Sequence, residues 1–124
     1  MSNERAGIVI VGGGAVGCAV AYSLAQAGKT DILLLEKEPG VAAATSSQAA
    51  GLVGQVRNTA ERVKLAMWSV ETFCRLQENE KCNPAWRQVG SLRVALNDER
   101  VEEFRHMKKV CDEAGLETEF IDQD

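Results

Sequence analysis

Histidine is scarce in this sequence. His106 is its single histidine, and it has no ligand spacing to any of the four cysteines, Cys18, Cys74, Cys82 and Cys111. No two cysteines form a Cys-x-x-Cys pair, so we expect no metal site. The cysteines are typical of reduced structural thiols, and Cys18 and Cys111 have the surroundings of small core residues. We therefore expect a reducing compartment, the cytoplasm or alternatively the mitochondrial matrix.

Clusters of basic charge are also lacking. The 124 residues include 14 Lys and Arg against 18 Asp and Glu, a formal net charge of −4, and only Lys108 and Lys109 are adjacent. Nucleic acids and anionic membranes are bound through basic patches, so neither partner is expected. With 45% hydrophobic and 26% charged residues, the composition is that of an ordinary globular domain.

No charged residue occurs in residues 7–28, GIVIVGGGAVGCAVAYSLAQAG. The stretch is long enough to span a membrane, but each of its central glycines costs a helix about 1 kcal/mol relative to alanine. A secretion signal is disfavoured because Glu4 and Arg5 give no net positive segment, despite the cleavage-like Ala25-Gln26-Ala27. Neither a membrane anchor nor a signal peptide is expected.

The stretch instead begins a strand–helix–strand pattern. Residues 6–11 form a short β-branched run that predicts a fully buried strand, and residues 15–27 predict a helix that ends at Gly28. Residues 31–35, DILLL, predict the second strand. Two parallel strands joined by a crossover helix make a βαβ unit, so the fold class is α/β and Rossmann-like. Two strands alone make such a sheet incomplete.

Further elements follow a stretch of small residues. Apolar residues at helical spacing predict a helix over 60–78, with Leu65 and Trp68 widening its apolar face. Alternation in residues 91–96 predicts a half-buried strand. A second helix is expected from Asn97 or Asp98 to Ala114, and residues 116–121 are a candidate for another strand.

The glycines after the first strand match the pattern G-x-G-x-x-G. In this motif the first glycine, Gly12, permits a tight turn, and the second, Gly14, lets a pyrophosphate approach the backbone. The third, Gly17, lets helix and strand pack closely, and the phosphates meet free N–H groups at the positive end of the helix. Glu36 ends the second strand 19 residues after Gly17, where a carboxylate accepts the ribose hydroxyls of an adenosine. The sequence therefore predicts a dinucleotide site, for either FAD or NAD.

Residues 44–54, ATSSQAAGLVG, carry too little apolar bulk for a core helix. Small residues and hydroxyls there suit a backbone packed against a large planar or phosphorylated ligand, although a surface loop is the alternative.

The segments IVIVGGGAVGCAVAYSLAQAG, ILLLEK, ATSSQAAGLV and WRQVGSLRVALNDERVEEF resemble, in this order, the D-amino-acid-oxidase-like flavoprotein family, and within it the sarcosine and dimethylglycine dehydrogenase branch. The resemblance implies a glutathione-reductase-like FAD fold. It divides the chain into part of an FAD-binding domain, 1–58, and a helix with the start of a substrate-domain excursion, 59–124. It also implies a cofactor-binding set of Gly12, Gly14, Ala15, Val16, Gly17, Glu36, Lys37, Thr45, Ser46, Ser47, Gln48, Gly51 and Leu52.

One position departs from the branch pattern. The family segment T-x-W-H-A-A-G-L carries a histidine bonded covalently to the flavin, and this sequence has Gln48 there. A glutamine amide is not nucleophilic enough to form such a bond, so the sequence predicts a non-covalent FAD.

The implied reaction is oxidation of a C–N bond in a small amine or N-methylated amino acid, by hydride transfer to the flavin. Oxygen or an electron-transfer protein would accept the electrons. No catalytic residue can be assigned; Arg57 is a candidate for contact with a substrate carboxylate, although a surface arginine is the simpler interpretation. Another FAD or NAD oxidoreductase, or a non-catalytic dinucleotide-binding module, are the alternatives. We expect the chain to be the N-terminal piece of a longer flavoenzyme, inactive alone.

Overall fold

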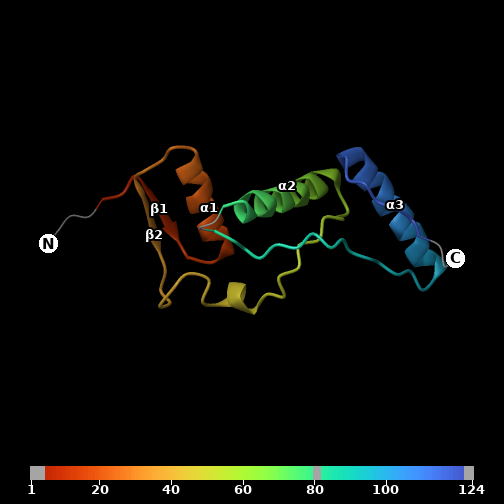
Figure 1. Cartoon of the computed structure of the whole chain (residues 1–124), viewed down its shortest axis with the longest axis horizontal. Coiled ribbons are helices and arrows are strands. Elements are labelled where there is room, and N and C mark those ends of the chain that lie inside the picture. The colour runs from red at the N-terminus through yellow and green to blue at the C-terminus, as the bar shows by residue number, and fades with distance from the viewer. Residues whose placement is uncertain (1–4, 80–81, 122–124) are drawn as a thin grey trace. The chain divides into compact units, whose positions relative to one another are not determined.

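A computed structural model describes residues 5–79 and 82–121, and the chain forms two compact units, Met1–Leu52 and Val53–Asp124 (Figure 1). The first unit contains strand β1 (Ile8–Val11), helix α1 (Ala15–Gln26), strand β2 (Ile32–Leu35) and the single-turn 3₁₀ helix η1 (Thr45–Gln48). The second contains helices α2 (Ala60–Gln77) and α3 (Asp98–Ala114).

The first unit is the expected βαβ arrangement. Strands β1 and β2 pair in parallel from Ile8 opposite Ile32 to Val11 opposite Leu35, and α1 connects them (Figure 1). Gly28 ends the helix in a left-handed conformation, φ 77°, that glycine adopts without strain. The strand–helix–strand prediction is confirmed, with strands and helix one or two residues shorter than expected.

The prediction of a fully buried first strand is wrong for the described residues. Alternate strand residues are half-buried, while Val9 is 51% and Val11 83% exposed, and α1 contains no buried residue. A parallel sheet is buried only when helices cover both of its faces, and α1 is the only α-helix of this unit's described residues. Cys18 on α1, expected in a core, is half-buried for the same reason.

The second unit has a small core between its two helices. Val63 and Cys111 are fully buried there together with Val110, and Ala66 and Val70 are buried along α2. Both helices confirm the predicted ranges within a residue, and both begin with a side-chain cap, as Thr59 accepts the Arg62 N–H and Asn97 the Arg100 N–H. Burial raises the pKa of the Cys111 thiol, as expected for a structural cysteine. Leu65 and Trp68, expected on the apolar face, are instead 62% and 53% exposed.

Neither predicted strand of the second unit forms among the described residues. Residues 82–97 and 116–121 contain no strand, and Leu92, Val94 and Leu96 are 74%, 66% and 90% exposed. A strand exists only when a neighbour completes its hydrogen-bond ladder, and the described part of this unit offers none. Residues 82–97 form instead an irregular segment that connects α2 to α3 (Figure 1). The side-chain amide of Gln77 binds this segment at Trp86. It donates to the Trp86 backbone carbonyl at 2.8 Å and accepts the Trp86 backbone N–H at 2.6 Å.

Replacing Val63 tests the helix–helix core. Val63→Ala removes two buried methyl groups, and we expect it to lower the free energy of unfolding by about 2 kcal/mol, measured by urea denaturation followed by circular dichroism. Leu65→Ala on the exposed face of the same helix is the matched control and should change stability by about 0.5 kcal/mol or less. Equal losses in the two variants would contradict this core.

Candidate functional site

The turn after β1 depends on two of its three motif glycines for its own packing. Gly12 has φ 100°, a conformation that favours glycine, and its N–H donates to the Leu35 carbonyl at 2.7 Å. A Cβ on Gly17 would lie 1.9 Å from the Gly12 carbonyl oxygen, so no side chain fits there. A Cβ on Gly14 would meet only the Ser46 hydroxyl, at an ordinary 3.6 Å. Packing among the described residues therefore does not require a glycine at position 14.

Several N–H groups where α1 begins have no partner within the helix itself. The first bond of the helix runs from the Cys18 N–H to the Gly14 carbonyl at 2.9 Å. The N–H groups of Ala15, Val16 and Gly17 consequently have no acceptor inside the helix. Gly14, the N-cap, has no side chain to offer, and the Ser46 hydroxyl accepts the Ala15 N–H at 3.1 Å. This end of the helix carries the positive end of its dipole and suits a phosphate.

The carboxylate of Glu36 binds the same turn. Its Oε2 accepts the Gly13 N–H at 2.6 Å, and its Oε1 accepts the N–H groups of Lys37 at 2.7 Å and Glu38 at 3.0 Å. The bonds from Glu38 and Gly13 hold the pKa of the Glu36 carboxyl below its ordinary value, against an opposing desolvation and with help from Lys37. The carboxylate is thus kept ionised at the carboxyl end of the sheet.

Gly13 is the residue of this site that sequence reasoning missed. It is buried, its carbonyl accepts the Ala42 N–H at 2.8 Å and the Cys18 thiol at 3.3 Å, and an added Cβ would lie 3.0 Å from Val41 and 3.1 Å from the Glu36 carboxylate. The only signal in the sequence is that the variable position of G-x-G is itself a glycine.

The structure brings together part of the predicted set. Residues 12–17, Glu36 and Ser46 meet at the carboxyl end of the strands through the contacts above. The Ser47 hydroxyl donates to the nearby carbonyls of Ala44 at 2.7 Å and Ala43 at 3.4 Å, and Leu52 is 89% exposed. Among the described residues, none of the remaining members forms a hydrogen bond to the glycine turn; they are Lys37, Thr45, Ser47, Gln48, Gly51 and Leu52.

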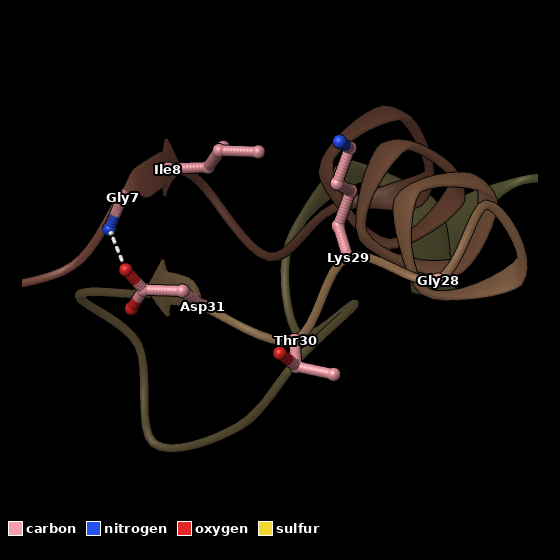
Figure 2. Close-up of a pocket in the computed structure, with 6 residues that line it drawn as sticks. All are labelled: Gly7, Ile8, Gly28, Lys29, Thr30 and Asp31. Carbon is pink, nitrogen blue, oxygen red and sulfur yellow. Dashed lines mark hydrogen bonds between the residues drawn. The ribbon is translucent and has the colours of Figure 1, made fainter.

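A shallow pocket lies at the opposite end of the two strands (Figure 2). The residues before β2 and at the start of β1 line it, and the Asp31 carboxylate accepts the Gly7 N–H there at 2.6 Å. Figure 2 shows the Lys29 side chain pointing away from that carboxylate. Open α/β sheets bind ligands at the carboxyl ends of their strands, so this pocket is separate from the candidate site.

The Arg57 guanidinium donates to the carbonyl of the preceding Val56 at 2.8 Å. Residues 5–79 and 82–121 hold no group of three or more His, Cys, Asp or Glu placed to bind a metal ion. Within the same ranges no helix has both the length and the apolar character needed to cross a membrane.

Alanine at two motif glycines should separate packing from ligand approach. Gly17→Ala places its Cβ into the Gly12 carbonyl, and we expect a loss of about 3 kcal/mol of stability in thermal or urea unfolding. Gly14→Ala is the matched control, since φ −76° and ψ −173° there suit alanine, and it should stay within about 0.5 kcal/mol of the wild type. A Gly17→Ala protein as stable as Gly14→Ala would show that helix and turn are not in contact.

The Glu36 carboxyl should titrate at a pH below that of an ordinary glutamate. Because its pKa is lowered by folding, its contribution to stability is present above the ordinary glutamate pKa and is lost as the pH falls through the folded-state value. Carboxyl-carbon NMR should give a lowered midpoint, and Glu36→Gln should flatten the pH dependence of stability over the same range. A midpoint at or above the ordinary value would contradict the three N–H bonds.

Known proteins are similar to this chain over nearly its whole length, not only at the glycine turn. The family profile described as FAD dependent oxidoreductase (DAO) matches residues 7–124. The chain is 39% identical over 116 residues to 4-methylaminobutanoate oxidase (formaldehyde-forming) of Paenarthrobacter nicotinovorans. This match covers 94% of this chain and 14% of the relative. It is 39% identical over 103 residues to mitochondrial dimethylglycine dehydrogenase of Rattus norvegicus, covering 83% of this chain and 12% of the relative.

A solved structure shows the same fold. L-Proline dehydrogenase from P. horikoshii matches with a TM-score of 0.82 and 26% identity, over 90% of this chain and 29% of that chain. The chain spans only a small part of the length of the curated relatives it matches. The profile match, together with the parallel strands and the glycine turn between them, shows that the chain belongs to the FAD dependent oxidoreductase (DAO) family.

Proposed function

We propose that this chain holds the ADP half of FAD within an oxidoreductase that oxidises a C–N bond of a small amine or N-methylated amino acid. The observation that carries the proposal is the glycine turn, where Gly14 is free of packing constraints beside the N–H groups that begin α1. Membership of the family supports FAD over NAD as the ligand.

The residues present fit a dinucleotide. The N–H groups of Val16 and Gly17 would bind the pyrophosphate. The Ser46 hydroxyl, which accepts the Ala15 N–H, would donate to a phosphate oxygen. A carboxylate has about four acceptor positions, two on each oxygen. Three of them on Glu36 hold backbone N–H groups, so one position on Oε2 stays open for a ribose hydroxyl. Lys37, Thr45, Ser47, Gln48, Gly51 and Leu52 keep their proposed places along the rest of the cofactor.

When bound, FAD supplies the hydride acceptor of the reaction. The substrate class is proposed from the relatives, whose names specify a methylaminobutanoate and a dimethylglycine. One relative is named an oxidase and the other a dehydrogenase, so we propose oxygen or an electron-transfer protein as the acceptor. We assign residues 1–58 to the FAD-binding domain and 59–124 to a helix and the start of the substrate-domain excursion. Relatives include mitochondrial and bacterial proteins, and we propose the cytoplasm for this one.

Titration with FAD tests the proposal. The protein should quench flavin fluorescence on binding FAD and should leave NAD unbound. Gly14→Ala should weaken FAD binding about tenfold or more without loss of stability, since its added methyl stands where the pyrophosphate approaches. Binding of NAD in preference to FAD, or unchanged FAD affinity in Gly14→Ala, would contradict the assignment.

Acid precipitation of the FAD complex tests the role of Gln48. With glutamine in place of the flavin-linking histidine, we propose a non-covalent cofactor, so all of the yellow flavin should stay in the supernatant. Flavin retained in the protein pellet would contradict it.

A further inference from the structure

Gly13 is the only buried residue among the described residues 5–52. Both of its backbone polar groups are bonded to atoms from distant parts of the unit. Its N–H donates to the Glu36 carboxylate at 2.6 Å, and its carbonyl accepts the Ala42 N–H at 2.8 Å and the Cys18 thiol at 3.3 Å. Three hydrogen bonds therefore fix the middle of the glycine turn.

Glu36 supplies the only charged group among these partners. It follows β2, while Gly13 follows β1, so its carboxylate ties together the two chain segments that leave the carboxyl end of the sheet. The same carboxylate also accepts the N–H groups of Lys37 and Glu38, which fix its own position. Hydrogen bonds to an ionised acceptor are stronger than those between neutral groups. A glutamine would offer one acceptor oxygen in place of two.

We propose that Glu36 is a positioning residue for the glycine turn, in addition to its place beside the ribose. Its bond to Gly13 holds the turn in the phosphate-binding conformation before the cofactor arrives. A turn that is already ordered loses less conformational freedom when a ligand binds. The link to phosphate binding rests on the proposed function, whereas the bond between Glu36 and Gly13 is a property of the protein without cofactor.

Amide exchange in the cofactor-free protein tests the bond directly. In Glu36→Gln, the Gly13 amide should exchange with solvent roughly tenfold faster than in the wild type, because a charge-assisted hydrogen bond is lost. Ser46→Ala is the matched control. It removes the acceptor of the Ala15 N–H and leaves the Gly13 bond in place, so Gly13 exchange should not change. Equal Gly13 exchange in the wild type and in Glu36→Gln would overturn the proposal.

The wild-type protein gives a second test that needs no variant to fold. The amide proton shift of Gly13 should titrate with the same midpoint as the Glu36 carboxyl carbon, because protonation weakens the acceptor. A Gly13 shift that is constant through that midpoint would overturn the proposal even if Glu36→Gln fails to fold.

Inorganic pyrophosphate separates positioning from contact with the ribose, since it contains no ribose. A positioning role predicts that Glu36→Gln weakens pyrophosphate binding as well as FAD binding, in competition or calorimetric titration. The loss should be larger for FAD, because the ribose contact is removed as well. Weaker FAD binding with unchanged pyrophosphate affinity would reduce Glu36 to a ribose contact and overturn the proposal. If the wild type binds neither ligand, the proposed function fails, while Gly13 exchange still decides whether Glu36 positions the turn.

Discussion

The close approach of α1 to the Gly12 carbonyl is the constraint on which the rest of the first unit depends. An added Cβ at Gly17 would lie 1.9 Å from that oxygen, so the helix starts where it does only because residue 17 has no side chain. This approach aims the N–H groups of the first helical turn at the carboxyl end of the sheet. Ser46 and Glu36 then have donors within reach. The absence of a side chain at residue 17 thereby determines where the start of α1 lies relative to Ser46 and Glu36.

Opposite electrostatic characters share this small region. The start of α1 is positive through N–H groups that have no acceptor within the helix, and the Glu36 carboxylate, bonded to Gly13 two residues before the helix, is negative. The negative carboxylate and the positive helix start stay separate because Glu36 accepts the Gly13 N–H. The N–H groups of residues 15–17 are left to other acceptors, as Ser46 shows for Ala15. The two features suit the phosphate and the ribose hydroxyl of the proposed cofactor.

Local sequence patterns predicted most of this structure. The prediction and the structure differ where an element or a contact depends on residues far away in the sequence. The βαβ unit and both long helices follow from apolar periodicity, capping residues and stop glycines within short windows. Residues 91–96 have the alternation of a strand, but that pattern cannot supply a neighbouring strand to complete the ladder. In the site, the motif predicted Gly12, Gly14 and Gly17. Gly13 went unnoticed because its partners Glu36 and Ala42 lie 23 and 29 residues further along the chain.

The amide of Gln77 has a consequence for association between chains. By bonding both backbone groups of Trp86, it takes the place that a neighbouring strand would occupy at that residue. Extended segments with exposed alternating apolar residues, such as Leu92, Val94 and Leu96, are templates for unwanted edge-to-edge pairing. Gln77 removes Trp86 from such pairing, since both backbone groups of that residue are already bonded. A neutral side chain on a helix thus satisfies backbone groups that a neighbouring strand would otherwise pair.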